Sequence, residues 1–256
     1  MIVVTKPMGN KTYRVVSPEI WEQICLVRDV IKKSPNFDLV TKHRVIHSLG
    51  VEAARHSVGI ELPNGHQARR GRAQRVAEEN LRSAQLYFEG HYGGELTDQL
   101  IMQSAGLLEP HITPVAYRSP TDPTTLSLGK NPHVYPANVE EQMDKFLKMN
   151  SRIYTSVGQA VHAHFHLARI HPFKDGNGRT ARLVQNGILN YNGFPPVVLE
   201  KYERSQYLDL VSLASASSME SDSIFRVTPD QAAFYNFMAT KVLDSLKHLL
   251  RESNAN

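Results

Sequence analysis

Twelve consecutive residues, HPFKDGNGRTAR from His171 to Arg182, bring together an imidazole, a carboxylate, a glycine-rich turn and two guanidinium groups. A buried core segment would not carry so many charges, because each charge would have to be paired or solvated at a large free-energy cost. The concentration of these side chains in one short stretch therefore indicates a site rather than a packing element.

The flanking segments are expected to be helices that position this stretch. Residues 157–170 carry apolar side chains at helical spacing, and Pro172 should end that helix. His171 is therefore expected at a helix end near the surface. Helical spacing resumes after the loop, through Leu183, Val184 and Ile188. The glycine-rich loop at 174–178 thus opens directly into the N-terminus of a second helix.

Such a loop is expected to bind an anion, because N–H groups and the positive end of the helix dipole point at whatever lies in it. Arg179 and Arg182 share one face of the predicted helix, and two guanidinium groups suit a polyphosphate better than a single carboxylate. Asp175 would then hold Mg²⁺ against the phosphate oxygens. His171, neutral near pH 7, could remove a proton from an incoming hydroxyl.

Each feature taken alone has an ordinary structural explanation. A histidine before proline is often only a helix C-cap, and an Asp-Gly-Asn-Gly sequence is commonly an ordinary turn. Arg179 and Arg182 alone would be a solvated helix face. Only the combination favours a catalytic interpretation.

The segment resembles the signature of the Fic family (filamentation induced by cyclic AMP), HxFx(D/E)GNGRxxR, and matches every specified position. The resemblance implies a mainly α fold, the Fic/Fido helical bundle with a β-hairpin flap. It also implies transfer of AMP from ATP, with Mg²⁺, to a Ser, Thr or Tyr hydroxyl of a protein. By this resemblance the roles are His171 as general base, Phe173 as structural anchor of the loop, Asp175 as metal ligand, and Lys174, Gly176, Asn177, Gly178, Arg179 and Arg182 as nucleotide-binding residues.

Two further segments resemble parts of the same family. Residues from Tyr117-Arg118 to about 137 are β-prone around a Gly-Lys-Asn-Pro turn, like the flap whose edge takes the target by strand addition. A plain surface hairpin is the alternative. Residues 201–215 resemble the helix that covers the nucleotide base, with Tyr207 facing the base. Leu208 and Ser215 stand where many AMP-transferring members have Tyr and Asn, so the preferred nucleotide is left open.

Ser57 and Glu61 match the first part of the family's inhibitory motif, (S/T)xxxE(G/N), on a helix expected near 38–62. A carboxylate placed against Arg182 would neutralise a phosphate ligand and repel the γ-phosphate. The resemblance also implies that such a glutamate can position a water that removes AMP from modified targets. Leu62 departs from the motif, and the alternative is that Glu61 is the exposed last turn of a helix ended by Pro63.

Composition favours a soluble enzyme. The single cysteine, Cys25, excludes an internal disulfide and fits a reducing compartment. No apolar run reaches the roughly 18 residues of a membrane span, and residues 1–11 lack the long apolar region of a signal peptide. We therefore expect a cytoplasmic protein with no membrane partner, although a translocated effector would look the same.

Two other clusters have ordinary interpretations. A basic group, Arg69, Arg70, Arg72 and Arg75, could bind nucleic acid, but Glu78 and Glu79 follow at helical pairing distance. A solvated helix face is therefore favoured. Three histidines at 162, 164 and 166 alternate along a predicted helix, so they scatter around its axis and cannot converge on one metal.

The chain is expected to be helical nearly throughout, with an N-terminal helical region at 1–95 and a Fic catalytic core at 96–256. Ser17-Pro18 and Thr228-Pro229-Asp230-Gln231 are predicted helix starts. The function predicted is an autoinhibited protein adenylyltransferase acting on a protein hydroxyl. Open alternatives are phosphate or UMP transfer on the same fold, or a non-catalytic regulatory protein, and a homodimer or self-modification is also open. Helices are expected near 18–33, 38–61, 69–90, 97–106, 138–149, 155–170, 177–191, 203–216 and 229–252.

Overall fold

The computed structural model describes residues 14–34, 39–61, 67–112, 115–119, 127–128, 131–132, 138–219 and 227–254. Within these ranges the chain is almost entirely helical, as predicted, and the helix bounds agree closely with those expected from the sequence. The helices are α1 Pro18–Lys33, α2 Leu39–Glu61, α3 Gln67–His91, α4 Asp98–Leu108, α5 Val139–Asn150, α6 Ser156–Ile170, α7 Asn177–Tyr191, the short 3₁₀ helix η2 Lys201–Glu203, α8 Arg204–Met219 and α9 Pro229–Asn254.

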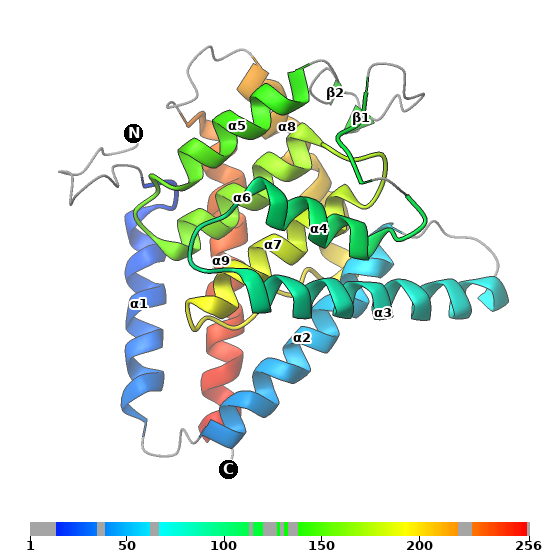
Figure 1. The fold of residues 1–256 in the computed structure, drawn as a ribbon. Helices are drawn as coiled ribbons and strands as arrows, with labels where there is room; N and C mark the ends of the chain where they lie inside the picture. The colour runs from blue at the N-terminus through cyan, green and yellow to red at the C-terminus, as the bar shows by residue number, and fades with distance from the viewer. Residues whose placement is uncertain are drawn as a thin grey trace.

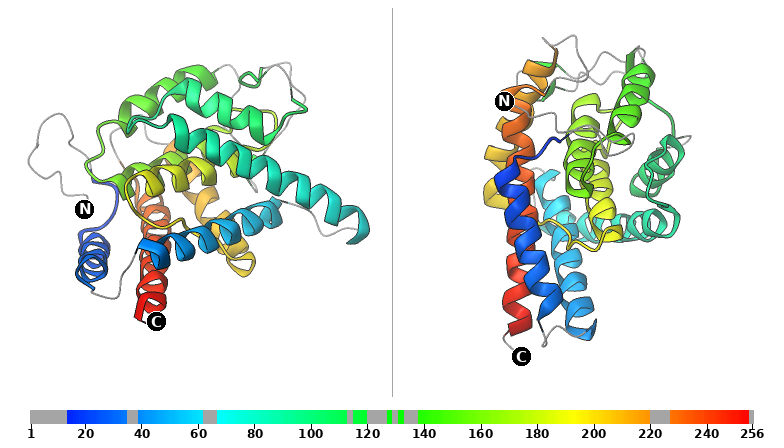
Figure 2. Two further views of the ribbon diagram at one scale, coloured as in Figure 1. Left: turned by 60° about the horizontal axis from the view of Figure 1, so that its bottom comes forward. Right: turned by 90° about the vertical axis from the view of Figure 1, so that its left-hand side faces the viewer.

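Helices α6 and α7 form the centre of the bundle and pack closely against each other (Figure 1). Helix α3 lies against α4 and α7, α5 and α9 lie against α6, and α8 packs on α9. Figure 2 shows α1 running alongside α9, where the Ser17 backbone N–H donates to Asn236 Oδ1 at 2.9 Å. The two helices that carry the motif are therefore held in the middle of the molecule.

The central position of α6 and α7 follows from their side chains. Residues of α6 are buried on nearly every face, and Thr155 caps its start by accepting the Gly158 N–H at 3.0 Å. In α7, Gly187 allows α3 to approach closely, because a Cβ at this position would lie 2.2 Å from Phe88 Cδ1. A side chain there would push α3 away from the motif helix.

One continuous apolar core joins the N-terminal and C-terminal regions. It extends from Val15, before α1, to Leu249 on α9, and includes Val45, Leu49 and Val58 of α2. The two regions therefore do not pack as separate bodies within the described residues. The predicted boundary between an N-terminal region (1–95) and a catalytic core (96–256) stays a prediction.

The predicted hairpin region contains two short strands, β1 Ser127–Leu128 and β2 Asn131–Pro132. They pair antiparallel, with Ser127 opposite Pro132 and Leu128 opposite Asn131, and they lie against α8. Most of the expected flap, including residues 120–126 and 133–137, lies outside the described part of the chain. Its role in taking up a target segment stays a prediction.

The expectation that the three histidines of α6 scatter around the helix axis is wrong for two of them, because His162 and His166 are one helical turn apart and their ring centroids lie 4.2 Å apart. His164 is fully buried, with Nδ1 2.5 Å from Gln185 Oε1 and Nε2 2.9 Å from the Tyr207 hydroxyl. His162 and His166 stack on Phe146. Burial lowers the pKa of His162 and of His164 to about 3, so both rings are neutral near pH 7.

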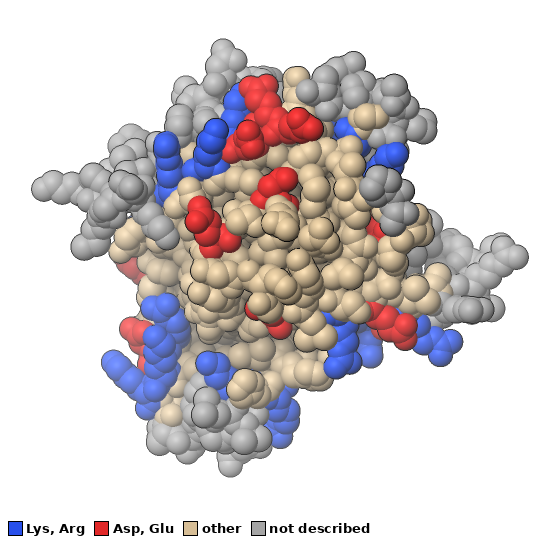
Figure 3. Space-filling view, viewed as in Figure 1, with Lys and Arg blue, Asp and Glu red and all other residues tan. Residues whose placement is uncertain are grey.

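Charge on the face seen in Figure 3 is mixed. Acidic side chains gather over α5, which begins with Glu140 and Glu141, and basic side chains lie over α1, which ends with Lys32 and Lys33. This face therefore lacks the uniform positive charge of a nucleic-acid surface.

In the basic cluster noted in the sequence, the side chains of residues 69, 70 and 72 are not among those that the structure describes. Among the described helices, none has both the length and the apolar character needed to cross a membrane.

The buried histidines predict a loss of stability in acid. Their pKa values are lower in the folded chain than in the unfolded chain, so the unfolded state binds more protons as the pH falls from about 6.5 toward 3. Each such histidine should lower the free energy of unfolding by at most about 1.4 kcal/mol per pH unit across this window. Urea denaturation at pH 7.5, 6.0 and 5.0 should show a falling midpoint below pH 6.5. A midpoint that stays constant from pH 7.5 to 5.0 would contradict the assignment.

Candidate functional site

The turn between α6 and α7 places His171 in a strained backbone conformation. His171 is the C-cap of α6, with φ 53° and ψ 57°, and its N–H donates to Leu167 O at 3.0 Å. Among the described residues other than glycine, it alone has a positive φ. A left-handed conformation costs an L-residue about 1–2 kcal/mol, so the surrounding contacts must hold it.

Arg118 supplies much of this support from outside the turn. Its Nε donates to His171 O at 2.6 Å, its Nη2 donates to Ile170 O at 3.1 Å, and its backbone N–H donates to Pro172 O at 2.8 Å. The side chain is buried, at 4 % exposure. The sequence indicated this residue only as the start of the flap region. No local pattern predicts a contact with a turn more than fifty residues away.

Asn177 fixes the turn from inside. The Phe173 N–H donates to Asn177 Oδ1 at 2.8 Å, and Asn177 Nδ2 donates to Phe173 O at 2.8 Å. This pair of bonds closes the loop between the two residues. Phe173 itself is 4 % exposed and belongs to the apolar core, with its ring 6.0 Å from that of Tyr117. The loop is therefore anchored at its beginning and at the first residue of α7.

The imidazole of His171 lies at the edge of the protein interior. Burial is the main cause that lowers its pKa to about 4, and the nearby charge of Arg118 acts in the same direction. Nδ1 lies 3.3 Å from Ala168 O. A proton on Nδ1, assigned from this contact, makes Nε2 the unprotonated ring nitrogen. His171 is thus neutral near pH 7 and can act as a proton acceptor.

The first turn of α7 begins at a glycine, as the sequence predicted. Gly176 is the N-cap, with φ 73°, and has no side chain to cap the first N–H groups of the helix. A Cβ at this position would lie 2.9 Å from Glu109 Cγ, so a side chain does not fit. Asp175 Oδ1 accepts the Gly176 N–H at 2.6 Å, while its side chain is 64 % exposed. Its carboxylate therefore faces outward at the mouth of the loop.

Arg179 is held by two carboxylates. Its Nη2 forms an ion pair with Glu109, and it lies 3.8 Å from Asp175 Oδ1. Glu109 follows the last turn of α4 and its side chain is 9 % exposed. Sequence reasoning did not identify Glu109, because a glutamate between a helix end and Pro110 carries no local sign of a partner seventy residues later. A phosphate that binds Arg179 must compete with this carboxylate.

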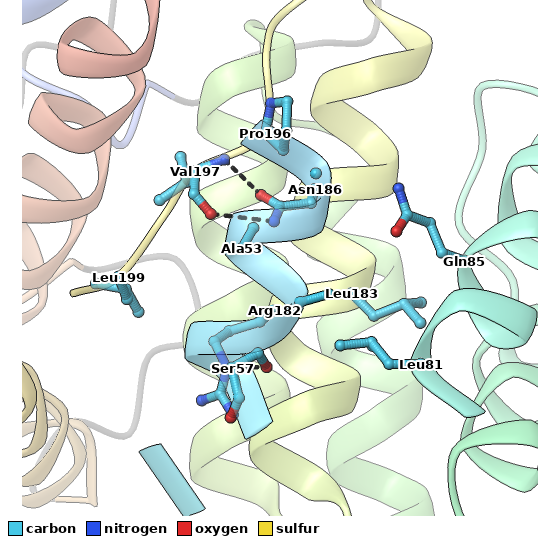
Figure 4. Close-up of a pocket in the computed structure, with 12 residues that line it drawn as sticks. Ala53, Ser57, Leu81, Gln85, Arg182, Leu183, Asn186, Pro196, Val197 and Leu199 are labelled. Atoms are coloured by element: carbon cyan, nitrogen blue, oxygen red, sulfur yellow. Dashed lines mark hydrogen bonds between the residues drawn. The ribbon is translucent and has the colours of Figure 1, made fainter. Parts of the chain in front are cut away.

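Arg182 is held by α2 (Figure 4). Its Nε donates to Ser57 Oγ at 2.7 Å and its Nη2 donates to Ser57 O at 3.1 Å. Arg182 is 7 % exposed and Ser57 is 4 % exposed. The predicted partner, Glu61, is the last residue of α2, and its side chain lies outside the described residues. The structure thus brings the predicted inhibitory helix to the predicted phosphate ligand through Ser57.

Two other predicted nucleotide ligands occupy different environments. Lys174 is exposed beside Asp175 on the loop. Tyr207 is 4 % exposed, and its hydroxyl contacts His164 in the core. Its predicted contact with the nucleotide base stays a prediction.

Comparison with known proteins shows that residues 84–189 match the family model described as the Fic/DOC family. This chain carries a Fic/DOC domain. The protein adenylyltransferase Fic of Drosophila mojavensis is 51 % identical over 59 residues, which cover 23 % of this chain and 12 % of that protein. The chain therefore spans only a small part of the curated relatives it matches.

Solved structures of Fic domains share the fold. A Fic domain containing signalling protein from Bacteroides thetaiotaomicron superposes with a TM-score of 0.70 at 18 % identity, covering 91 % of this chain and 97 % of that one. IbpAFic2 in complex with adenylylated Cdc42 superposes with a TM-score of 0.54 at 20 % identity, covering 91 % and 72 %. At these identities the likeness establishes the fold, which is the mainly α Fic/Fido bundle.

The closed loop yields a stability prediction. Asn177→Ala should lower the free energy of unfolding by about 1–3 kcal/mol, because it removes two buried hydrogen bonds and leaves the Phe173 N–H and carbonyl without these partners. Asn192→Ala is the matched control, since Asn192 lies after the other end of α7 and its side-chain amide donates one hydrogen bond, to Ile188 O, among the described residues. Urea unfolding of the two variants should show the larger loss for Asn177→Ala. Equal losses would contradict the proposed closure.

Proposed function

We propose that this Fic domain transfers AMP from ATP to a hydroxyl side chain of a protein. The observation that carries the proposal is a neutral imidazole, His171, fixed at a strained turn directly before a helix N-terminus that bears two arginines. The relatives named protein adenylyltransferase and the structure with adenylylated Cdc42 support this choice of reaction for the same fold.

His171 would accept the proton of the target hydroxyl at Nε2 as the hydroxyl oxygen attacks the α-phosphorus. The bond from the α-phosphorus to the bridging oxygen then breaks, and pyrophosphate leaves. The first N–H groups of α7 and the Arg179 guanidinium would stabilise the charge that develops on the phosphate oxygens. The fixed turn contributes by holding base and phosphate in line before reaction.

The donor set at the mouth of the loop fits Mg²⁺. The ion prefers oxygen ligands and is commonly held by one or two carboxylates together with substrate phosphates. Asp175 offers an outward carboxylate beside the helix N-terminus. Bound there, Mg²⁺ would neutralise phosphate charge, and Asp175 would be its protein ligand.

We further propose that the conformation described is an autoinhibited one. Both arginines already have protein partners, Arg179 with Glu109 and Arg182 with Ser57. ATP would have to displace these contacts, and for Arg182 this requires movement of α2. A groove of about 720 Å³ lies between α2 and α3, so α2 is not packed along its whole length. This groove supports the proposal that α2 can shift without unfolding of the bundle.

The choice of donor nucleotide depends on the residues that would contact its base. Tyr207, the predicted base contact, has its hydroxyl on His164, and Ser215 of α8 is 1 % exposed. Transfer of phosphate or UMP on the same fold therefore stays an alternative. Parallel incubations with ATP labelled at the α-phosphate, ATP labelled at the γ-phosphate and UTP labelled at the α-phosphate distinguish the three reactions.

The base assignment predicts the behaviour of His171 variants. His171→Ala should lower labelling of target protein from α-labelled ATP by at least about a hundredfold, because the proton acceptor is lost. His171→Asn should be equally inactive while it tolerates the left-handed backbone. Scintillation counting of protein from a treated lysate measures the transfer, and His91→Ala, an exposed histidine on α3, serves as the control. Labelling that survives in both position-171 variants would refute the assignment.

The inhibitory role predicts gain of activity. Glu61→Gly and Glu61→Gln should each raise AMP transfer several-fold, because each removes a carboxylate that we propose repels the γ-phosphate at Arg182. Arg55→Gly places the same helix-weakening residue at an exposed position of α2 and should leave the rate unchanged. Rates with α-labelled ATP test all three variants. Equal activation by Arg55→Gly would show that loosening of α2, rather than the carboxylate, controls the rate.

A further inference from the structure

A group of metal-ligating side chains lies on the part of α2 that precedes the Arg182 contact. Glu52 and His56 are one helical turn apart on α2, and Glu200 approaches them from the segment after α7. His56 Nδ1 lies 3.4 Å from Glu200 Oε2, and His56 Nε2 lies 3.9 Å from Glu52 Oε1. One ligand atom from each residue can be chosen so that all three lie within 4.8 Å of one another.

We propose that Glu52, His56 and Glu200 bind one Zn²⁺ ion that links α2 to the segment after α7. Ligand atoms bonded to tetrahedral zinc at about 2.0–2.1 Å lie about 3.4 Å apart. The separation between His56 Nδ1 and Glu200 Oε2 therefore already fits such a site. Glu52 has a side chain that is 48 % exposed and can rotate to complete a set of three protein ligands.

The composition of the group favours zinc over the hard cations. An imidazole with two carboxylates suits Zn²⁺, whereas Mg²⁺ and Ca²⁺ prefer oxygen ligands alone. Spacing of Glu52 and His56 at i and i+4 places both side chains on one face of α2, as metal-binding helices require.

Glu200 is held in place by contacts of its own segment. Its backbone N–H donates to Glu203 Oε2 at 3.0 Å, and Glu203 Oε1 in turn contacts Lys241 Nζ of α9 at 2.7 Å. Earlier in the segment, Asn186 of α7 clamps Val197 by two hydrogen bonds, of 2.9 and 3.2 Å (Figure 4). One ligand therefore belongs to a fixed part of the bundle, and the other two belong to α2.

A bound ion would restrain the contact that closes the phosphate site. His56 directly precedes Ser57, whose hydroxyl and carbonyl oxygens accept hydrogen bonds from Arg182. Zn²⁺ would thus hold Ser57 on Arg182. This consequence for activity rests on the proposed function, whereas binding of the ion does not.

Calorimetric titration of the full chain with ZnCl₂ at pH 7.5, without nucleotide, tests the site. Wild type and His47→Ala, an exposed histidine on the same helix, should bind one equivalent with equal affinity. His56→Ala and Glu200→Gln should each bind at least about tenfold more weakly, as expected for loss of a ligand. Mg²⁺ should give no corresponding binding. Equal Zn²⁺ affinity in wild type and His56→Ala would overturn the proposal.

Hydrogen exchange and activity give independent readouts. Zn²⁺ should slow amide exchange in α2 of wild type and of His47→Ala but not of His56→Ala, and unchanged exchange in all three would overturn the link to α2. In the AMP-transfer assay, Zn²⁺ should slow wild type more than His56→Ala. Equal inhibition of the two would refute the effect on activity, while the titration without nucleotide decides the binding site on its own.

Discussion

The arrangement of the site depends on one turn that reverses the chain between α6 and α7. Six residues separate the two helices, and their backbone is held by Arg118 from outside and by Asn177 from inside. These hydrogen bonds hold His171 in a conformation that a free peptide rarely adopts. The imidazole, the exposed carboxylate and the start of α7 take their positions from this turn, so the chemistry depends on backbone contacts as much as on the reactive side chains.

Helix α2 ties the N-terminal region to the chemistry. It reaches the second arginine of the motif through Ser57, and it packs on α3, α7 and α9 through few buried side chains. Glu109, at the end of α4, forms an ion pair with the first arginine of the motif, Arg179. The two guanidinium groups that would bind phosphate are therefore engaged from two different elements. Under the proposed function, ATP would therefore compete with Glu109 and Ser57 for these two arginines.

The sequence predicted the helices well because caps and apolar spacing are local signals. Ser17 with Pro18 starts α1, and the capping box of Thr228 and Gln231 starts α9, with bonds of 2.8 and 3.2 Å between them. The motif also predicted the helix end at His171 and the helix start after Gly176. Local signals could not predict Glu109 or the contacts of Arg118, because their partners are distant in the chain. Local signals also could not predict that the Tyr207 hydroxyl contacts the buried His164, and the contact of Tyr207 with a nucleotide base stays a prediction.

The order of the two contacting segments along the chain has a consequence for biosynthesis. Ser57 precedes Arg182 by 125 residues. At ribosomal rates of about 5–20 residues per second, α2 is made roughly 6–25 s before the arginine it contacts. When the turn between α6 and α7 first folds, α2 has already been synthesised. Ser57 is therefore already present in the nascent chain when Arg182 is made, whereas a contacting helix that followed the motif would be made after the arginine.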